Sequence, residues 1–218
     1  MTDATPMQAY YAARAREYDQ VYLKPERQQD LRAIEQWLAP RFTARRMLEV
    51  ACGTGYWTQF IAPTAAQVLA LDSSTETIEI ARTRVPSDKV QFLTGDAYAL
   101  PQSTPRCDGA FAGFWFSHVP RARWREFLLG LNAVLAPDAA VVLLDNRYVP
   151  GSSSPISEHD LQGNSYQNRA LLDGTQHRLL KNFPSEPELL DLLHGLGLQG
   201  RYSAWPYYWA LEYAVARP

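Results

Sequence analysis

Apolar runs and helical patterns alternate through the middle of the chain. Strands are expected at five short runs that are almost continuously apolar: RMLEVA, QVLALD, VQFLTGD, CDGAFAGFWF and AAVVLLD. Between them, YWTQFIA, TETIEIARTR and residues 124–135 carry apolar side chains three and four positions apart, which predicts helices. Strands that alternate with helices form a parallel sheet covered on both faces. The pattern therefore predicts a doubly wound, mostly parallel α/β fold.

The segment before this region is expected to be helical. Thr5, Pro6 and Gln8 form a helix start, because threonine caps, proline fits the first turn and glutamine completes a capping box. A second helix is predicted from about residue 26 to 38, and Pro40 is expected to end it. Residues 1–40 are interpreted as a helical cap on a single domain that spans the chain.

Serine and glutamate three positions apart predict two further helix starts. Ser73 with Glu76 is expected to cap the helix TETIEIARTR, and Ser185 with Glu188 to cap a last helix. The aromatic segment 202–215 that follows is expected to complete the edge of the sheet.

Residues 149–183 break the alternation and are interpreted as an insertion after the fifth strand, over the active site. The run VPGSSSPISEHD predicts a loop, and the Asp-Gly pair at 173–174 predicts a β-hairpin. If these two residues form the turn, Arg169 lies directly opposite Arg178. Lys181 then lies on the other face, unless a bulge turns it round.

Composition narrows the class of protein. The 218 residues are 46% hydrophobic and 20% charged, which is typical of a globular domain. A formal charge of −2 provides no basic surface for nucleic acid. Cys52 and Cys107 have neither metal-ligand spacing nor a disulfide pattern, and no leader or membrane-spanning run is recognised. We expect a cytoplasmic monomer or homodimer that acts on a small molecule without a metal.

A glycine loop follows the first strand in EVACGTGYW, residues 49–57. A dinucleotide loop has the form GxGxxG, but Thr58 stands where the third glycine is expected. Glu49, at the end of the strand, would repel a pyrophosphate and suits an amine instead. Both residues disfavour a nicotinamide-dependent oxidoreductase, which stays an alternative.

With Glu49 before alternating glycines and an aspartate ending each of the next two strands, the sequence resembles the class I S-adenosylmethionine-dependent methyltransferases. The resemblance implies a seven-stranded Rossmann-like sheet and the methyl donor S-adenosylmethionine, which leaves as S-adenosylhomocysteine. It implies that the loop lies against the methionine part, that Asp72 binds the ribose and that Asp96 binds the adenine. The implied positions are Glu49, Ala51, Gly53, Gly55, Asp72, Ser73, Asp96 and Ala97. Either aspartate alone would equally be typical of a helix or turn cap.

Aromatic and cationic residues are expected to complete the site. In related enzymes an N-terminal segment covers the cofactor, and aromatic residues after the fourth strand flank it. Contact with the cofactor is expected for Tyr11, Arg14, Tyr18, Trp57 and Phe114, and contact with the substrate for Tyr10 and Trp115. For the N-terminal residues the alternative is an amphipathic helix that packs on the sheet edge.

His118 is the candidate catalytic residue. It follows the fourth strand at the carboxyl edge of the predicted sheet, where ligands bind in open α/β folds. It could remove a proton from a neutral acceptor, position the acceptor, or only bind the backbone. An acceptor that is already an anion needs no base.

The hairpin suggests the kind of acceptor. Two arginines that face each other repel unless an anion lies between them, and their planar donor groups suit a carboxylate or phosphonate. The runs YYAARAREYD, VACGTGYWT, HVP and R-x-L-x-DG followed by R-x-x-K resemble small bacterial methyltransferases related to the phosphonate O-methyltransferase of dehydrophos biosynthesis. This resemblance implies O-methylation of a small oxyanion, with Arg169, Arg178 and Lys181 as binding residues. A solvated hairpin face, a small-molecule N- or phenol O-methyltransferase, an RNA or protein methyltransferase and a noncatalytic nucleoside-binding protein are the alternatives.

Overall fold

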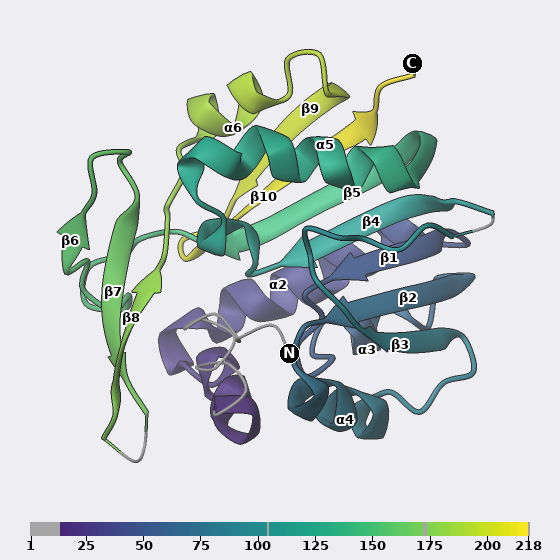
Figure 1. Cartoon of the computed structure of the whole chain (residues 1–218). Coiled ribbons are helices and arrows are strands. Elements are labelled where there is room, and N and C mark those ends of the chain that lie inside the picture. Colours follow the sequence, from purple (N-terminus) through teal and green to yellow (C-terminus); the bar gives the residue numbers. More distant parts are fainter. Residues whose placement is uncertain (1–13, 104, 172–173, 218) are drawn as a thin grey trace.

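The computed structural model describes residues 14–103, 105–171 and 174–217 (Figure 1). The expected helix start at residues 5–8 lies outside them, as do Tyr10 and Tyr11. The described chain opens with η1 (Ala15–Tyr22), η2 (Pro25–Arg27), α2 (Gln28–Leu38) and η3 (Ala39–Phe42). The α-helix ends at Leu38, just before Pro40, as predicted. The chain continues in 3-10 form because proline is tolerated in the first turn of a new helical segment.

A seven-stranded sheet forms the centre of the molecule, in the order β3-β2-β1-β4-β5-β10-β9. The strands are β1 (Arg46–Val50), β2 (Gln67–Asp72), β3 (Val90–Thr94), β4 (Cys107–Gly113), β5 (Leu135–Asn146), β9 (Gly197–Ala204) and β10 (Tyr208–Val215). Strands β1 to β5 pair in parallel, whereas β10 is antiparallel to β5 and β9. This topology confirms the doubly wound, mostly parallel sheet. The segment 202–215 was expected to complete the edge of the sheet. On this side β9 forms the edge, whereas β10 lies between β5 and β9.

Alternation of side chains along the central strands produces the two covered faces. Met47, Phe111 and Val142 point to one face, where they pack with residues of α2, α3 (Thr58–Ile61) and α4 (Thr75–Arg84). Figure 1 shows these three helices on the same side of the sheet. A change of one register position in any of these strands would exchange the buried sets, so the alternation specifies the fold.

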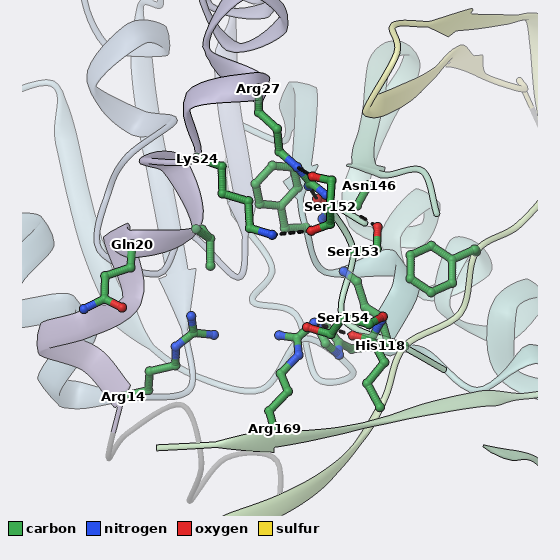
Figure 2. Close-up of a pocket in the computed structure, with 15 residues that line it drawn as sticks. Arg14, Gln20, Lys24, Arg27, His118, Asn146, Ser152, Ser153, Ser154 and Arg169 are labelled. Atoms are coloured by element: carbon green, nitrogen blue, oxygen red, sulfur yellow. Dashed lines mark hydrogen bonds between the residues drawn. The ribbon is translucent and has the colours of Figure 1, made fainter. Parts of the chain in front are cut away.

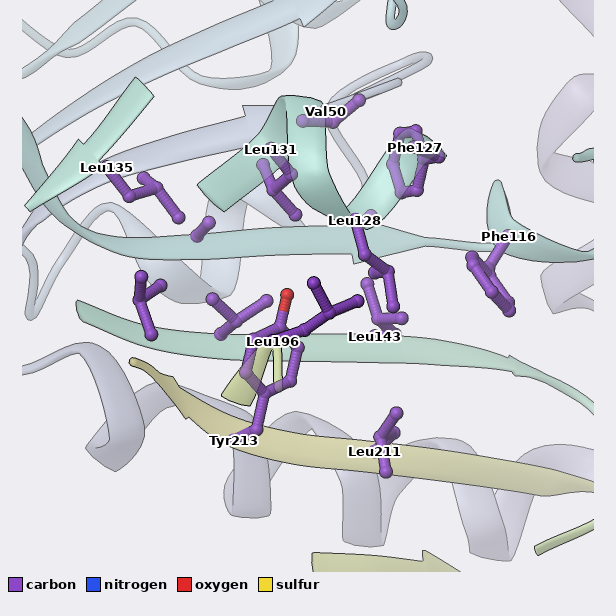
Figure 3. Packing of buried hydrophobic residues seen from close by; sticks show 14 of the residues in the cluster. Val50, Phe116, Phe127, Leu128, Leu131, Leu135, Leu143, Leu196, Leu211 and Tyr213 are labelled. Carbon is purple, nitrogen blue, oxygen red and sulfur yellow. The ribbon is translucent and has the colours of Figure 1, made fainter. Parts of the chain in front are cut away.

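The second face is covered by α5 (Trp124–Val134) and α6 (Glu186–Leu192). Leu48 and Leu143 belong to the core on this side, with Leu128 and Leu131 of α5. Figure 3 shows Leu143 beside these two residues of α5. The short segments η4 (Phe116–His118) and η5 (Arg121–Arg123) connect β4 to α5. In the part of the chain that the structure describes, no helix is both long and apolar enough to cross a membrane.

The serine caps agree with the prediction at one helix and not at the other. The predicted capping box at Ser185 and Glu188 is present. At α4, however, the cap is Ser74, whose Oγ accepts a hydrogen bond from the Thr77 amide at 3.2 Å. Ser73 was the wrong choice, because Ser74 is the last residue before the helix and has extended backbone.

The insertion after β5 is a small antiparallel sheet of three strands rather than a two-stranded hairpin. It consists of β6 (Glu158–His159), β7 (Ser165–Ala170) and β8 (Gln176–Leu180), in that order. Figure 1 shows it projecting at one end of the central sheet, near the N-terminal helical segments.

The hairpin register differs by one residue from the prediction. Arg169 pairs with His177, and Asn168 pairs with Arg178. The Leu171 amide bonds to the Thr175 carbonyl at 3.0 Å, so the loop has three residues instead of two, with Gly174 at φ +85°. Three-residue loops of this kind place glycine in the left-handed region. Because a shift of one residue reverses the faces, Arg169 and Arg178 lie on opposite sides of the sheet.

Candidate active site

Two cavities meet at the carboxyl ends of β1, β2, β4 and β5. The smaller, of about 60 Å³, is lined by the glycine loop, the end of β2 and residues after β4. The larger, of about 260 Å³, lies between the N-terminal segments and the insertion. Phe114 and His118 line both cavities. These two residues therefore mark the place where a ligand in one cavity would contact a ligand in the other.

The glycine loop is held against the end of β2. Backbone φ angles are positive at Ala51 (+55°), Gly53 (+54°) and Gly55 (+76°). A side chain at Gly55 would lie 3.1 Å from Cβ of Ala81 in α4, so glycine also permits close packing of this helix. Ala51 adopts the left-handed conformation without being glycine, a conformation that costs an alanine about 1 kcal/mol.

Asp72 organises the loop from the neighbouring strand. Its carboxylate accepts the amides of Gly53 at 2.8 Å and Ser74 at 2.9 Å, and the Thr77 hydroxyl at 3.1 Å. It lines the smaller cavity together with Ser73. Burial outweighs these hydrogen bonds and raises the pKa of Asp72 above its usual value. The carboxylate is thus desolvated and available to accept from a ligand.

Glu49 lies beneath the loop and is 1% exposed. Its Oε2 atom has no hydrogen-bond partner among the described residues. Burial, with a smaller effect from Asp72, raises the pKa of Glu49 to about 8. The protein without a ligand therefore holds this carboxyl group protonated at neutral pH.

The pKa of Glu49 makes a prediction about stability. Between about pH 4.5 and pH 8 the unfolded chain ionises this group and the folded protein does not, so it lowers the unfolding free energy progressively as pH rises. The unfolding free energy of Glu49→Gln relative to wild type is expected to increase by at most about 1.4 kcal/mol for each unit that the pH rises within this window. Thermal unfolding of the ligand-free proteins at pH 5 and pH 8 measures the difference. Glu79→Gln, at an exposed position of α4, is the control. A Glu49→Gln difference that stays constant with pH would contradict the raised pKa.

Aromatic residues form the wall between the cavities. Phe114 has φ +59° and stacks with Tyr208 at 5.6 Å between ring centroids. Trp115 lines the smaller cavity and not the larger one, where a substrate contact was expected. Trp57 lines neither cavity. It is 3% exposed and packs edge-on against Phe114 at 5.9 Å, so it supports the wall from behind.

Of the two residues expected to bind the adenine, only one lines the smaller cavity. Ala97 lines the smaller cavity, whereas Asp96 is exposed and absent from its lining. The Asp96 carboxylate accepts the Tyr98 amide at 2.9 Å, which is the turn-capping arrangement that the sequence left open.

His118 is 4% exposed and held in one orientation. Its Nδ1 lies 2.7 Å from the Leu180 carbonyl oxygen. A carbonyl only accepts, so Nδ1 carries the proton and Nε2 is the basic nitrogen of the neutral ring. Burial, reinforced by the Lys181 charge, lowers the pKa of His118 to about 3. The imidazole is thus neutral at physiological pH and a weak base.

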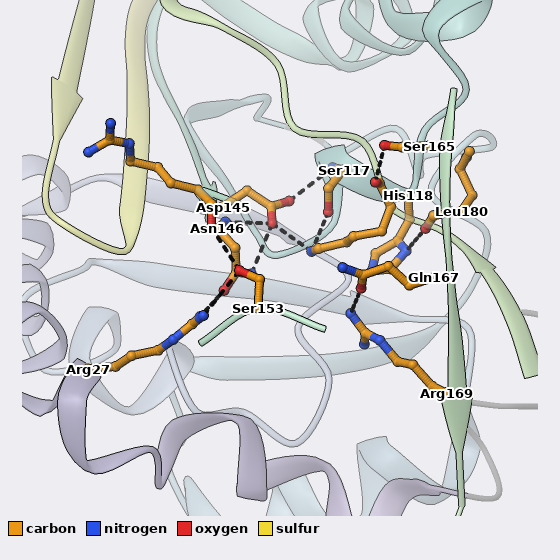
Figure 4. A network of polar contacts seen from close by, with 12 residues as sticks. Arg27, Ser117, His118, Asp145, Asn146, Ser153, Ser165, Gln167, Arg169 and Leu180 are labelled. Atoms are coloured by element: carbon orange, nitrogen blue, oxygen red, sulfur yellow. Dashed lines mark hydrogen bonds and ion pairs between the residues drawn. The ribbon is translucent and has the colours of Figure 1, made fainter. Parts of the chain in front are cut away.

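A buried ion pair lies beside His118 (Figure 4). Lys181 Nζ donates to Asp145 Oδ1 at 2.9 Å and to Ser117 Oγ at 2.6 Å. The other oxygen of Asp145 accepts the Ser117 amide at 2.9 Å. Burial opposes ionisation of Asp145, but the Lys181 ammonium outweighs it and holds the pKa of Asp145 below its usual value. The pair fixes the insertion to the end of β5.

Arg169 enters the larger cavity from the same face of the insertion as Lys181. Its Nη2 donates to Gln167 Oε1 at 2.7 Å, and its buried Nε has no hydrogen-bond partner in the described part of the chain. Gln167 is itself held by the Ser154 carbonyl at 2.6 Å. Arg169 forms no ion pair with any described residue, so its charge faces the cavity uncompensated.

The sequence assigned Arg178 to the same site, and this was wrong. Arg178 is about half exposed, pairs with Glu158 and lies over the ring of Tyr166 at 3.5 Å. The three-residue loop turns it to the outer face of the insertion. Lys181 takes the place beside Arg169, because the same shift brings it to the inner face without a bulge.

The N-terminal segments contribute further cations to the larger cavity. Arg14 lines this cavity rather than the smaller one, where a cofactor contact was expected. Tyr18 lies in η1, and its side chain is outside the described set. Lys24 and Arg27 also line the larger cavity, together with Ser152 of the insertion. Neither Lys24 nor Arg27 was predicted as a site residue, although the sequence LKPER shows their charges close together.

The core of this chain matches a known domain. The family described as "Methyltransferase domain" matches residues 47–138, which contain the glycine loop, Asp72 and β4. A probable S-adenosylmethionine-dependent methyltransferase of Mycobacterium tuberculosis is 40% identical over 68 residues, covering 31% of this chain and 24% of that protein. This chain thus spans about a quarter of the length of that curated relative. Malonyl-[acyl-carrier protein] O-methyltransferase of Pectobacterium atrosepticum is 27% identical, covering 73% of this chain and 67% of that protein.

A solved structure matches nearly the whole chain. The DhpI-SAM-HEP complex superposes with a TM-score of 0.79 and 29% identity, covering 98% of this chain and 96% of that one. These matches confirm the resemblance to the class I S-adenosylmethionine-dependent methyltransferases that the sequence predicted. The chain resembles DhpI, a methyltransferase of the dehydrophos pathway.

The DhpI structures contain S-adenosylhomocysteine or S-adenosylmethionine, and these similarities support S-adenosylmethionine as the cofactor. The structure fits such a ligand on two counts. The buried, unpartnered Glu49 oxygen suits the cofactor's ammonium group, and the desolvated Asp72 carboxylate faces the cavity that contains Ser73 and Ala97. The loop lacks the third glycine of a dinucleotide-binding loop, because Thr58 stands at that position.

Proposed function

We propose that this methyltransferase transfers the methyl group of S-adenosylmethionine to an oxygen of a small anionic metabolite, a phosphonate or a carboxylate. The observation that carries the proposal is the joining of two cavities at Phe114 and His118. One cavity has the glycine loop and Asp72, and the other has Arg169 and Lys181. The anionic acceptor is inferred from the cations of the larger cavity.

The cofactor would occupy the smaller cavity. The loop of Ala51, Gly53 and Gly55 would lie along its methionine part, and Asp72 with Ser73 would bind the ribose. Ala97 would contact the adenine with Trp115 on one side, and the backbone after Asp96 would complete that end. The smaller cavity has a volume of about 60 Å³ and continues into the larger one at Phe114 and His118.

Asp72 provides a test of this placement. Asp72→Asn replaces a charged acceptor with a neutral amide, and affinity for S-adenosylhomocysteine is expected to fall about 10- to 100-fold. Calorimetric titration measures the affinity, with Asp88→Asn in the exposed loop before β3 as the control. Equal affinities of wild type and Asp72→Asn would contradict the ribose assignment.

Bound S-adenosylmethionine supplies an electrophilic methyl group on a positively charged sulfur. Arg169 and Lys181 would hold the acceptor so that one of its anionic oxygens faces the junction of the cavities. That oxygen donates an electron pair to form the new O–CH₃ bond, and the pair of the broken S–CH₃ bond stays on sulfur. No proton is transferred. Phe114 and the buried residues around it exclude water from the reacting atoms.

His118 fits a positioning role better than a base. A pKa of about 3 leaves the ring neutral but gives Nε2 little tendency to take a proton from a phenol or amine. An anionic acceptor needs no such transfer, and a hydroxyl group or water of the acceptor complex could donate to Nε2. This property favours the oxyanion over the phenol and amine alternatives.

The remaining expectations form part of the same proposal. The chain would act as one domain, with residues 1–40 as a cap and residues 149–183 as an insertion over the active site. The partner would be a small molecule, without nucleic acid, in a cytoplasmic monomer or homodimer. The O-methyltransferase of Pectobacterium and the DhpI complex support an oxygen acceptor by similarity.

An acceptor screen tests the proposal. The protein would be incubated with S-adenosylmethionine that carries a labelled methyl group and with representative phosphonates, carboxylates, phenols and primary amines. Label is expected in phosphonate or carboxylate esters. Methyl transfer to phenols and primary amines is expected to be at least about tenfold slower. Transfer to phenols or amines alone would refute the anionic acceptor.

A further inference from the structure

A second cationic site faces the larger cavity from the N-terminal side. Arg27 is 5% exposed and donates to Asn146 Oδ1 at 2.8 Å, Ser152 Oγ at 2.9 Å and Ser153 Oγ at 3.5 Å. Lys24 donates to the Ser152 carbonyl. Two positive side chains thus converge on one residue of the insertion, and every acceptor they use is neutral.

No carboxylate of the described residues is paired directly with either cation of this site. Within the part of the chain that the structure describes, neither Lys24 nor Arg27 forms an ion pair, whereas Lys181 is paired with Asp145. The closest acidic neighbour in this group is Glu26, which accepts the Ser152 hydroxyl at 2.7 Å and is otherwise solvated. A nearly buried guanidinium without a counter-charge is costly, and a bound anion would relieve that cost.

The second site is separate from the Arg169 site. Figure 2 shows Lys24 and Arg27 entering from one side of the cavity and Arg169 from the other. Burial lowers the pKa of Lys24, the charge of Arg27 lowers it further, Glu26 opposes this, and Arg169 adds a smaller lowering effect, so Arg169 acts on the same space as Lys24 and Arg27. That shared space would hold a molecule with a negative group at each end.

We infer that the methyl acceptor carries two anionic groups, and that Lys24 and Arg27 bind the one that is not methylated. The inference rests on the proposed function for the first anionic group. The second is a carboxylate or phosphonate, because Arg27 presents a planar set of donors and Lys24 a point charge beside it. Binding at both ends also positions the reacting oxygen, since the acceptor then has little freedom to rotate.

Paired ligands test the inference by binding alone. The probes are phosphonoacetate, 3-phosphonopropionate and 4-phosphonobutyrate, each with its neutral carboxamide analogue, titrated into protein saturated with S-adenosylhomocysteine. For at least one chain length the diacid is expected to bind about tenfold or more tightly than its amide. In Lys24→Met this ratio is expected to fall about threefold or more, and Lys24→Arg should retain it.

Lys89→Met is the matched control. Lys89 bonds to the Pro63 and Ala65 carbonyls near the start of β3, at the opposite edge of the sheet, so its loss removes the same charge without changing the ratio. Thermal unfolding verifies that all variants fold. A diacid that binds no better than its amide at every chain length, or a ratio unchanged in Lys24→Met, would overturn the second site. Methyl transfer to both diacids and amides would still uphold the proposed function, whereas no transfer to either would refute that function instead.

Discussion

Replacing Arg169 with alanine is expected to lower kcat/KM for the anionic acceptor about 100-fold, while affinity for S-adenosylhomocysteine changes less than about twofold. Arg169 forms no ion pair with a described residue, lines the larger cavity and donates to Gln167 at 2.7 Å. Charge-assisted hydrogen bonds from a guanidinium are stronger than neutral ones, and an aligned pair also orients the acceptor. Steady-state kinetics with saturating S-adenosylmethionine measures the acceptor effect, and titration with S-adenosylhomocysteine measures the cofactor effect.

Arg178→Ala is the matched control for this experiment. Both arginines come from the same hairpin, but Arg178 is exposed on its outer face and pairs with Glu158. Its removal is expected to leave kcat/KM unchanged within about twofold. Large effects of both substitutions would contradict the three-residue loop and favour the two-residue turn, in which both arginines share one face, whereas no effect of Arg169→Ala would contradict the acceptor site.

The largest effect on stability is expected from Asp145→Asn. The substitution leaves the Lys181 ammonium buried without its counter-charge, which costs about 3–5 kcal/mol of unfolding free energy. For a domain of this size that loss corresponds to a fall in Tm of about 10 °C.

A double variant separates the ion pair from other effects of the substitution. Asp145→Asn combined with Lys181→Met removes both charges, and should recover a large part of the stability that the single variant loses. The wild-type contribution also depends on pH. The folded pKa of Asp145 lies below its unfolded value, so the contribution is present above about pH 4 and is lost as pH falls through the folded pKa. A double variant no more stable than Asp145→Asn, with Tm measured at pH 7, would show that the pair is not the cause.

The central sheet and the cofactor cavity could be predicted because they depend on local patterns. Each buried strand is an apolar run whose alternate residues pack on the two faces of the sheet. In β1, Leu48 packs on one face and Met47 on the other. Glu49 and Asp72 end neighbouring parallel strands, so their proximity follows from the topology alone. The sequence also identified the loop glycines, which have positive φ in the structure.

The acceptor cavity depended on details that local patterns do not contain. Asp-Gly at 173–174 indicated a hairpin correctly, but the loop length decided which arginine faced inward. Lys24 and Arg27 meet Ser152 across about 125 residues of sequence, so no spacing rule connects them. Long-range packing therefore decides the acceptor side, whereas strand order decides the cofactor side.

The most direct test of the central claim uses an acceptor that offers two kinds of atom in one molecule. 2-Amino-3-phosphonopropionate has an amine as well as a carboxylate and a phosphonate, one at each end, and S-adenosylmethionine with a ¹³C-labelled methyl group reports which group is methylated. The account predicts the ¹³C-methyl resonance of an O-methyl ester, which is split by coupling to phosphorus if the phosphonate is methylated. A labelled methyl signal without phosphorus coupling, at the position of an N-methyl group, would contradict it.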